Sequence, residues 1–115
     1  MKTIEELQNE VKKFCEDRDW NQFHNPKDLA IGISTEANEL LDIFRFKSIN
    51  EIEHNFDYFL PKVEDEIADV LFFVLRFAQM SNIDLGQALV RKLSKNSEKY
   101  TIERSKGNNK KYTEY

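Results

Sequence analysis

The sequence is poor in the residues that most non-helical folds require. Its 115 residues include three glycines, two prolines and one cysteine. Sandwiches, barrels and doubly wound sheets need many turns, so this scarcity argues against them. The single cysteine, Cys15, excludes a disulfide framework and a thiolate zinc cluster. No apolar run approaches the roughly 18–20 residues of a membrane span, and the charged residues near the start argue against a secretory signal.

Charged residues are plentiful, with a small acidic excess. There are 21 Asp and Glu against 17 Lys and Arg, which gives a formal net charge of -4. Nucleic-acid surfaces need clustered positive charge, so this balance argues against one. The length suits a single domain with its own core. We therefore expect one all-α, cytoplasmic domain over residues 1–115 that binds neither nucleic acid nor membrane.

Apolar periodicity and capping residues predict a bundle of four helices. The first is expected over residues 4–19 with Thr3 as its N-cap, and the second from Pro26 to about 47 with Asn25 as its N-cap. A loop or short helical turn is expected over 48–60. The third helix is predicted over 61–80 and the fourth over 84–104, followed by an extended tail over 105–115.

The second and third predicted helices each carry two carboxylates spaced i, i+3 on or beside the apolar face. Packing carboxylates together without a positive charge is costly. A hard divalent cation suits such an all-oxygen site. The alternative is that Arg45, Lys62 or Arg76 folds inward and forms ion pairs. The four carboxylates are Glu36, Glu39, Glu66 and Asp69.

This acidic signature resembles that of the all-α nucleoside triphosphate pyrophosphohydrolases, the MazG-like superfamily. The resemblance is closer to the dCTP pyrophosphatase branch, because the loop over residues 18–26 (RDWNQFHNP) and the segment 40–47 are similar to that branch. The end of the chain, from Lys92 through residues 111–114, is also similar.

The resemblance implies Mg²⁺-dependent hydrolysis of dCTP or a 5-modified dCTP to the monophosphate and pyrophosphate, with Mn²⁺ as an alternative cation. The four carboxylates match the family's metal ligands and would serve catalysis by a metal-activated water attacking the α-phosphorus. The expected purpose is sanitation of the nucleotide pool. The family also forms dimers that pair into tetramers with active sites near subunit boundaries, so we expect a homo-oligomer, a dimer or a dimer of dimers.

The resemblance assigns substrate contacts as well. Aromatic faces stack on bases, and amide or imidazole groups read base edges. For Trp20 and Phe23 the alternative is a hydrophobic plug at the end of the bundle. Phe46 stands where the branch has tryptophan and Phe73 where it has tyrosine. The expected contacts are Trp20, Asn21, Gln22, Phe23, His24, Phe46, Phe73, Lys92, Asn96, Lys99 and Tyr100.

Three other functions compete with this interpretation. A di-iron carboxylate bundle needs Glu-x-x-His pairs, and neither acidic helix contains histidine. Within the enzyme class, an all-α dUTPase-like or other nucleoside triphosphate pyrophosphohydrolase specificity is the alternative. Outside it, an acidic helical interaction module would account for the charge, although such a module has no need to turn carboxylates inward.

Overall fold

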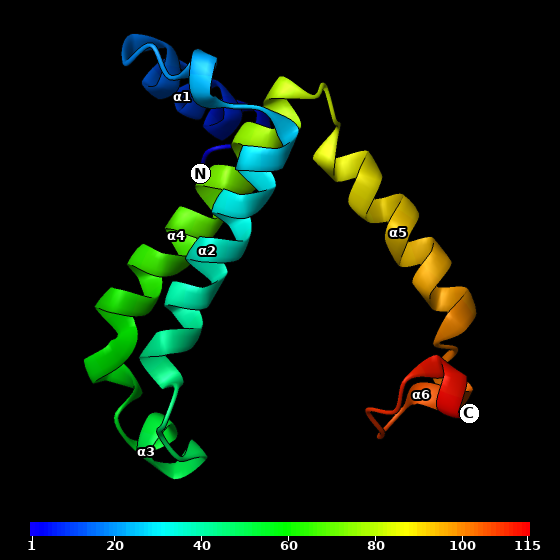
Figure 1. Ribbon diagram of the computed structural model, residues 1–115. Coiled ribbons are helices and arrows are strands. Elements are labelled where there is room, and N and C mark those ends of the chain that lie inside the picture. The colour runs from blue at the N-terminus through cyan, green and yellow to red at the C-terminus, as the bar shows by residue number, and fades with distance from the viewer. The chain divides into compact units, whose positions relative to one another are not determined.

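The computed structural model describes all 115 residues and contains helices and loops only (Figure 1). None of the helices combines the length and apolar character that a membrane span requires. The chain forms two compact units, residues 1–82 and 83–115, which are described separately. The α-helices are α1 (Ile4–Asp17), α2 (Pro26–Phe44), α3 (Ile49–His54), α4 (Phe56–Met80), α5 (Leu85–Lys99) and α6 (Ile102–Ser105). Short 3₁₀ helices cover Asn21–Phe23 and Tyr112–Glu114.

The predicted helix starts at Thr3, Asn25 and Asp84 are confirmed. Thr3 and Glu6 form a reciprocal capping box at the start of α1. The Asn25 side chain accepts from the backbone N–H of Asp28 at 2.9 Å, with Pro26 in the first turn of α2. At the start of α5 the Asp84 carboxylate accepts from the backbone N–H of Gln87 at 3.0 Å. Each cap satisfies a backbone donor that has no partner inside its helix.

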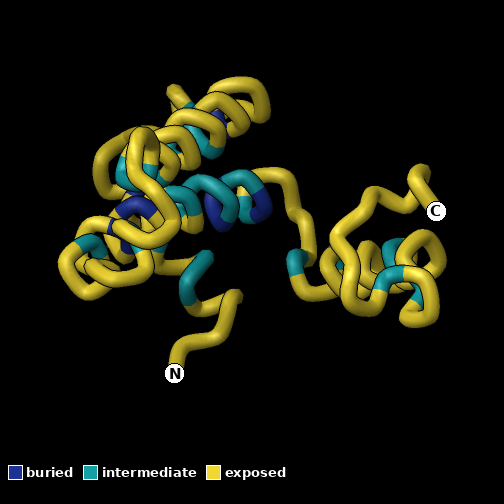
Figure 2. Tube along the Cα trace, turned by 90° about the horizontal axis from the view of Figure 1, so that it is seen from below, coloured by how far each residue is buried: buried dark blue, intermediate teal, exposed yellow.

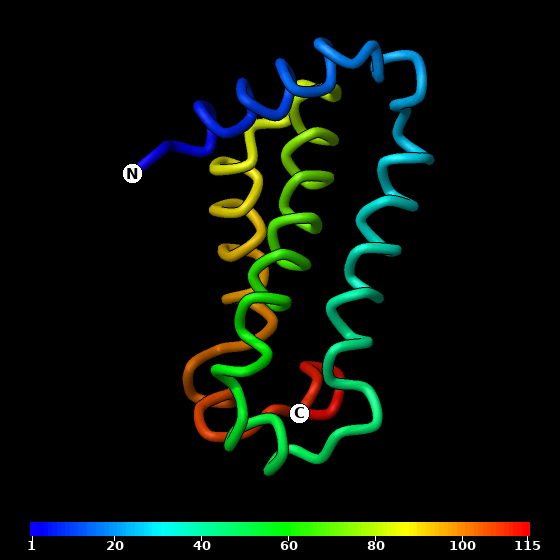
Figure 3. The backbone as a smooth tube through the Cα atoms, turned by 90° about the vertical axis from the view of Figure 1, so that its left-hand side faces the viewer, coloured from blue at the N-terminus to red at the C-terminus, as the bar shows by residue number.

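In residues 1–82, α2 and α4 run side by side and α1 packs across α4 (Figures 1 and 3). All buried residues lie on these three helices, and they are the dark blue segments of the tube in Figure 2. None of residues 83–115 is buried. The core of the first unit consists of Cys15, Leu29, Val63, Leu75 and Ala78.

Gly32 allows α2 to approach α4 closely. A Cβ at this position would lie 2.6 Å from the Cδ1 and Cε1 atoms of the Phe73 ring. No ordinary contact between carbon atoms is that short, and the near end of the ring cannot move away without shifting its helix. The half-buried Phe73 ring therefore occupies the space that any side chain at position 32 would need.

We predict that Gly32→Ala destabilises the protein although alanine favours helix formation. The propensity gain is about 1 kcal/mol, whereas overpacking of this kind costs about 1–3 kcal/mol. Urea unfolding monitored by circular dichroism measures the net change. Gly32→Ala combined with Phe73→Leu should recover part of the loss because the ring is removed. An increase in stability for the single variant would contradict the packing described.

The prediction that the third long helix begins at Pro61 is wrong. Helix α4 begins at Phe56, so Pro61 lies inside it, whereas α3 agrees with the short helical turn expected within 48–60. Proline removes one backbone donor from the second turn of α4, which a helix can tolerate when packing holds that turn. Phe59 provides such packing, since its ring meets that of Phe44 edge-to-face at 6.3 Å between centroids.

The C-terminal part of the chain also differs from the prediction. Helix α5 ends at Lys99 rather than near 104, and Thr101 caps the separate helix α6 by accepting from the Arg104 N–H. The predicted extended tail folds back: the Tyr100 ring meets the rings of Tyr112 and Tyr115 at 5.6 and 6.1 Å. These two contacts of Tyr100 hold the tail against the end of α5. The chain therefore has four long α-helices, as expected, together with the short helices α3 and α6.

Candidate metal centre and substrate site

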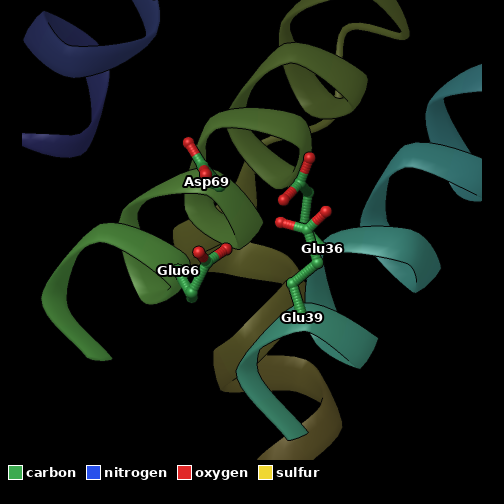
Figure 4. Close-up of side chains that lie close together, drawn as sticks. All are labelled: Glu36, Glu39, Glu66 and Asp69. Carbon is green, nitrogen blue, oxygen red and sulfur yellow. The ribbon is translucent and has the colours of Figure 1, made fainter. Parts of the chain in front are cut away.

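The four predicted carboxylates converge between two helices. Glu36 and Glu39 project from α2, and Glu66 and Asp69 project from α4 (Figure 4). One ligand atom from each residue can be chosen so that all four lie within 4.8 Å of one another. The i, i+3 spacing places both members of each pair on one helix face, and the α2–α4 contact brings the two pairs together. We refer to these four residues as the carboxylate cluster.

Two oxygens of the cluster are buried without any partner. Glu66 is only 4% exposed, and Glu36 is half-buried. The Oε2 atoms of both residues are buried and accept no hydrogen bond. A buried carboxylate oxygen without a donor is costly unless a cation compensates it. An all-carboxylate donor set with two such oxygens fits a hard divalent cation.

Ion pairing accounts for only one contact in the cluster. The Lys62 ammonium lies 3.0 Å from Glu66 Oε1. Of the three basic side chains in the ion-pair alternative, Lys62 therefore does form an ion pair with the cluster. Arg45 is on the surface, 3.9 Å from Asp42. Arg76 is buried but bonds to neutral groups elsewhere. A single ammonium therefore faces four carboxylates.

The crowding of these groups changes their acidity. Hydrogen bonding with Glu66 and Glu36, together with their negative charges, raises the pKa of Glu39 from 4.5 to about 7. The Lys62 ammonium lowers the pKa of Glu66, and Glu66 in turn raises the pKa of Lys62. The cation-free cluster thus retains a proton on Glu39 close to neutral pH.

We predict that divalent cation binding displaces this proton. Because the pKa of Glu39 is raised to about 7, apparent affinity should weaken as pH falls below 7, by up to about tenfold per pH unit for one proton. The same shift means that the cation-free protein loses stability as pH rises from about 4.5 through 7. Calorimetric titration with Mg²⁺ in buffers of different ionisation enthalpy measures proton release at pH 6 and pH 8. Glu39→Gln should abolish the pH 6 release, and equal affinity at both pH values would refute the prediction.

An open hollow adjoins the cluster at the C-terminal end of α2. It has a volume of about 440 Å³. Two lysines stand among its carboxylates and aromatic rings. Ammonium groups commonly bind phosphate oxygens. The lining residues are Glu39, Asp42, Ile43, Lys47, Tyr58, Phe59 and Lys62.

The loop before α2 carries most of the residues predicted to contact a base. Trp20 packs edge-on against Phe14 at 5.6 Å yet remains 37% exposed, and Phe23 is 61% exposed. Trp20 therefore partly fits the hydrophobic-plug alternative, because one side of its ring packs on Phe14. Phe23 does not fit it, because most of its side chain is exposed. Gln22 donates to the backbone oxygen of Asp19 at 3.0 Å and stabilises the loop itself. His24 is half-buried.

Phe46 lies at the other end of α2. It follows the helix with φ of 69° and is 90% exposed. The 19-residue helix spans about 28 Å at 1.5 Å per residue. Phe46 and the loop with Trp20 therefore do not meet within one chain. The carboxylate cluster lies between them, and Phe73 packs on Gly32 in the α2–α4 contact.

The remaining predicted contacts belong to residues 83–115. Lys92, Asn96 and Lys99 share one face of α5, and of these Asn96 is half-buried. The Lys99 ammonium lies over the Tyr112 ring at 4.9 Å, so it takes part in the packing of the C-terminal tail. Tyr100 ends the helix, and its ring contacts the same tail.

The sequence interpretation did not predict that Arg76 binds the loop before α2. Its side chain is 1% exposed, and its Nε donates to His24 Nδ1 at 2.9 Å. Its Nη1 donates to Gln79 Oε1 at 2.6 Å and its Nη2 to Asn21 Oδ1. A signal was present, because Arg76 is the one charged residue in the apolar run 70–78. Two of its three partners, His24 and Asn21, lie more than 50 positions away, which periodicity cannot reveal.

Comparison with known proteins agrees with this description. The MazG-like family matches residues 31–115. dCTP pyrophosphatase 1 of Mus musculus is 32% identical, with 97% of this chain and 67% of that protein aligned. The Homo sapiens protein of the same name is 28% identical over the same shares. The crystal structure of a pyrophosphatase from Archaeoglobus fulgidus is 37% identical with a TM-score of 0.82, covering 88% of this chain and 94% of that one.

The all-helical fold, the carboxylate cluster and these relatives define the class of protein: an enzyme of the nucleoside triphosphate pyrophosphohydrolase type. Within that class, the chain belongs to the MazG-like family.

Proposed function

We propose that this protein hydrolyses dCTP, or a 5-modified dCTP, to the monophosphate and pyrophosphate with Mg²⁺ as cofactor and Mn²⁺ as a substitute. The observation that carries the proposal is the carboxylate cluster with its two unpartnered buried oxygens. The similarity to dCTP pyrophosphatases over 97% of the chain supports the choice of substrate. Such a reaction would remove unwanted deoxynucleotides from the pool.

The carboxylate cluster would hold the cation through Glu36, Glu39, Glu66 and Asp69. When bound, the cation neutralises phosphate charge and lowers the pKa of water at the α-phosphorus. Lys47 and Lys62, which line the adjoining hollow, are placed to bind the phosphate oxygens of the leaving group. Glu39, the exposed glutamate of the cluster, is the candidate for accepting the proton of the attacking water.

The base would lie toward the loop over residues 20–24. Arg76, to which this loop is bonded, follows Asp69 by seven residues, so the loop contact lies about 10 Å along α4 from the cluster. A sugar and base extending from an α-phosphate at the cluster can bridge such a distance. From the family resemblance, Lys92, Asn96, Lys99 and Tyr100 are proposed as further contacts to triphosphate and sugar.

We also propose that the enzyme is a homo-oligomer. A base cannot contact both Trp20 and Phe46 of one chain, because α2 separates them. A second copy could supply the other aromatic ring. Each unit also exposes apolar side chains at helical spacing, which is typical of association surfaces. They are Leu60, Ile67 and Leu71 on α4, and Leu89, Val90 and Leu93 on α5. Multi-angle light scattering at micromolar concentration should give a dimer or tetramer mass, and a monomer mass would contradict this proposal.

Pyrophosphate release from dCTP, 5-methyl-dCTP, dUTP and dTTP tests the function. With Mg²⁺ present, we expect dCTP or its 5-methyl derivative to have the highest kcat/KM. A preference for dUTP would instead support a dUTPase-like specificity. If the wild type and Glu66→Ala both gave only background release, the acidic interaction module would be the better description.

A further inference from the structure

Arg76 is a buried cation with no anionic partner. Its side chain is 1% exposed, and all three groups that accept its hydrogen bonds are neutral: His24, Asn21 and Gln79. Burying a guanidinium costs free energy, and well-packed apolar residues often serve stability equally well or better. The groups that Arg76 holds therefore point to a role beyond stability.

The guanidinium fixes the hydrogen-bonding state of His24. Arginine is always protonated and can only donate, so His24 Nδ1, which receives the Nε–H at 2.9 Å, must be the unprotonated nitrogen. The ring proton is then on Nε2. Burial and the positive charge of Arg76 lower the pKa of His24, which keeps the ring neutral. Neutral His24 therefore presents one N–H donor at Nε2.

The same guanidinium fixes the orientation of the Asn21 side-chain amide. Its Nη2 donates to Asn21 Oδ1, which uses the acceptor of the amide and leaves the NH₂ group. The Nε–H and Nη2–H of arginine point along one edge of the fork in parallel. Nδ1 of His24 and Oδ1 of Asn21 are thereby held side by side. Both residues turn their acceptors to Arg76 and keep their donors for another partner.

We propose that Arg76 is a positioning residue that makes Asn21 and His24 a donor-only edge, and that this edge selects cytosine over uracil and thymine. Cytosine has two neighbouring acceptors, O2 and N3, on its pairing edge. Uracil and thymine carry a hydrogen on N3, so a second donor there has no acceptor to meet. The inference rests on the proposed function for the placement of the base near this loop. It adds that the Asn21 and His24 side chains are the groups that recognise the base.

Asn21→Asp is the sharpest test. The carboxylate keeps an oxygen for Arg76 Nη2, so the fold is preserved, but the amide donor is lost. We expect the ratio of kcat/KM for dCTP to that for dUTP to fall about tenfold or more, chiefly through KM, because a site built to hydrogen-bond an atom discriminates strongly by it. Gln79→Glu is the matched control: it makes the same change on the opposite edge of the guanidinium and should leave the ratio as in wild type.

Nitrogen NMR tests the tautomer without any turnover. The chain has two histidines, so His54→Gln leaves the signals of His24 alone. At neutral pH, Nε2 should be protonated and Nδ1 should have the shift of an unprotonated acceptor. Arg76→Lys should return the ring toward a mixture of tautomers. A wild-type ring protonated at Nδ1 would overturn the inference.

Binding of dCMP and dUMP separates failure of the inference from failure of the proposed function. If no triphosphate is hydrolysed but dCMP binds more tightly than dUMP and Asn21→Asp removes the difference, the function fails and the inference stands. If dCTP is hydrolysed and Asn21→Asp leaves both the turnover ratio and the binding ratio unchanged, the inference is wrong and the function stands.

Discussion

Glu66→Gln is expected to lower kcat/KM for dCTP by about a thousandfold or more. The substitution keeps the size of the side chain and removes the charge from the most buried member of the carboxylate cluster. A catalytic cation contributes several kcal/mol of charge stabilisation in the transition state. Each 1.36 kcal/mol corresponds to about a factor of ten in rate.

Calorimetric titration with Mg²⁺ measures the loss of cation affinity, and a pyrophosphate release assay measures the loss of turnover. Glu64→Gln is the matched control, because Glu64 is an exposed residue of the same helix outside the cluster. It should retain wild-type turnover and cation affinity. Full activity of Glu66→Gln would show that the cluster is not the catalytic centre.

The same variant should lose only a little stability when no cation is present. The Lys62 ammonium lowers the pKa of Glu66, so the folded protein favours the charged carboxylate, and glutamine gives up that ion pair. Lys62 loses its partner at little cost because its side chain is 67% exposed. A large activity loss with only a small stability loss would distinguish a functional carboxylate from a structural one.

Leu29→Ala is expected to have the largest effect on stability. Leu29 is 1% exposed in the core of residues 1–82 and lies on α2 near the loop that is proposed to hold the base. Truncation of a fully buried leucine costs about 2–5 kcal/mol because a cavity remains. For a domain of this size the melting temperature should fall by about 10 °C or more.

Leu41→Ala is the control for this prediction. Leu41 lies on the same helix but is 58% exposed, so its truncation should change stability by about 0.5 kcal/mol or less. Thermal unfolding of the two variants and the wild type, monitored by circular dichroism at one protein concentration, compares them directly. Equal melting temperatures for the two variants would show that Leu29 is not part of the core.

The convergence of the carboxylates could be predicted because it depends on local periodicity. Glu36 and Glu39 repeat the spacing of Glu66 and Asp69, and that spacing fixes which side of each helix they occupy. The sequence also indicated that the two helices pack by their apolar faces. Those two facts suffice to bring the pairs together, whereas the burial of single oxygens and the raised pKa of Glu39 depend on atomic packing.

The predictions that were wrong or missing also have specific physical causes. Local sequence predicts a helix start at Pro61, but the contact between Phe59 and Phe44 holds a helical turn before it. The tail was predicted to be extended because tyrosine contacts across more than ten positions have no local signature. The contacts of Arg76 with His24 and Asn21 were missed for the same reason.

The division of the carboxylate cluster between two helices has a mechanical consequence. Two of its members belong to α2 and two to α4, and none to a loop. A cation held by all four would therefore cross-link the helices without a covalent bond. Because a ligand that binds only the folded state stabilises it, amide hydrogen exchange along both helices should slow together as the cation concentration rises. Depletion of the cation would loosen this helix pair first and expose it to proteases.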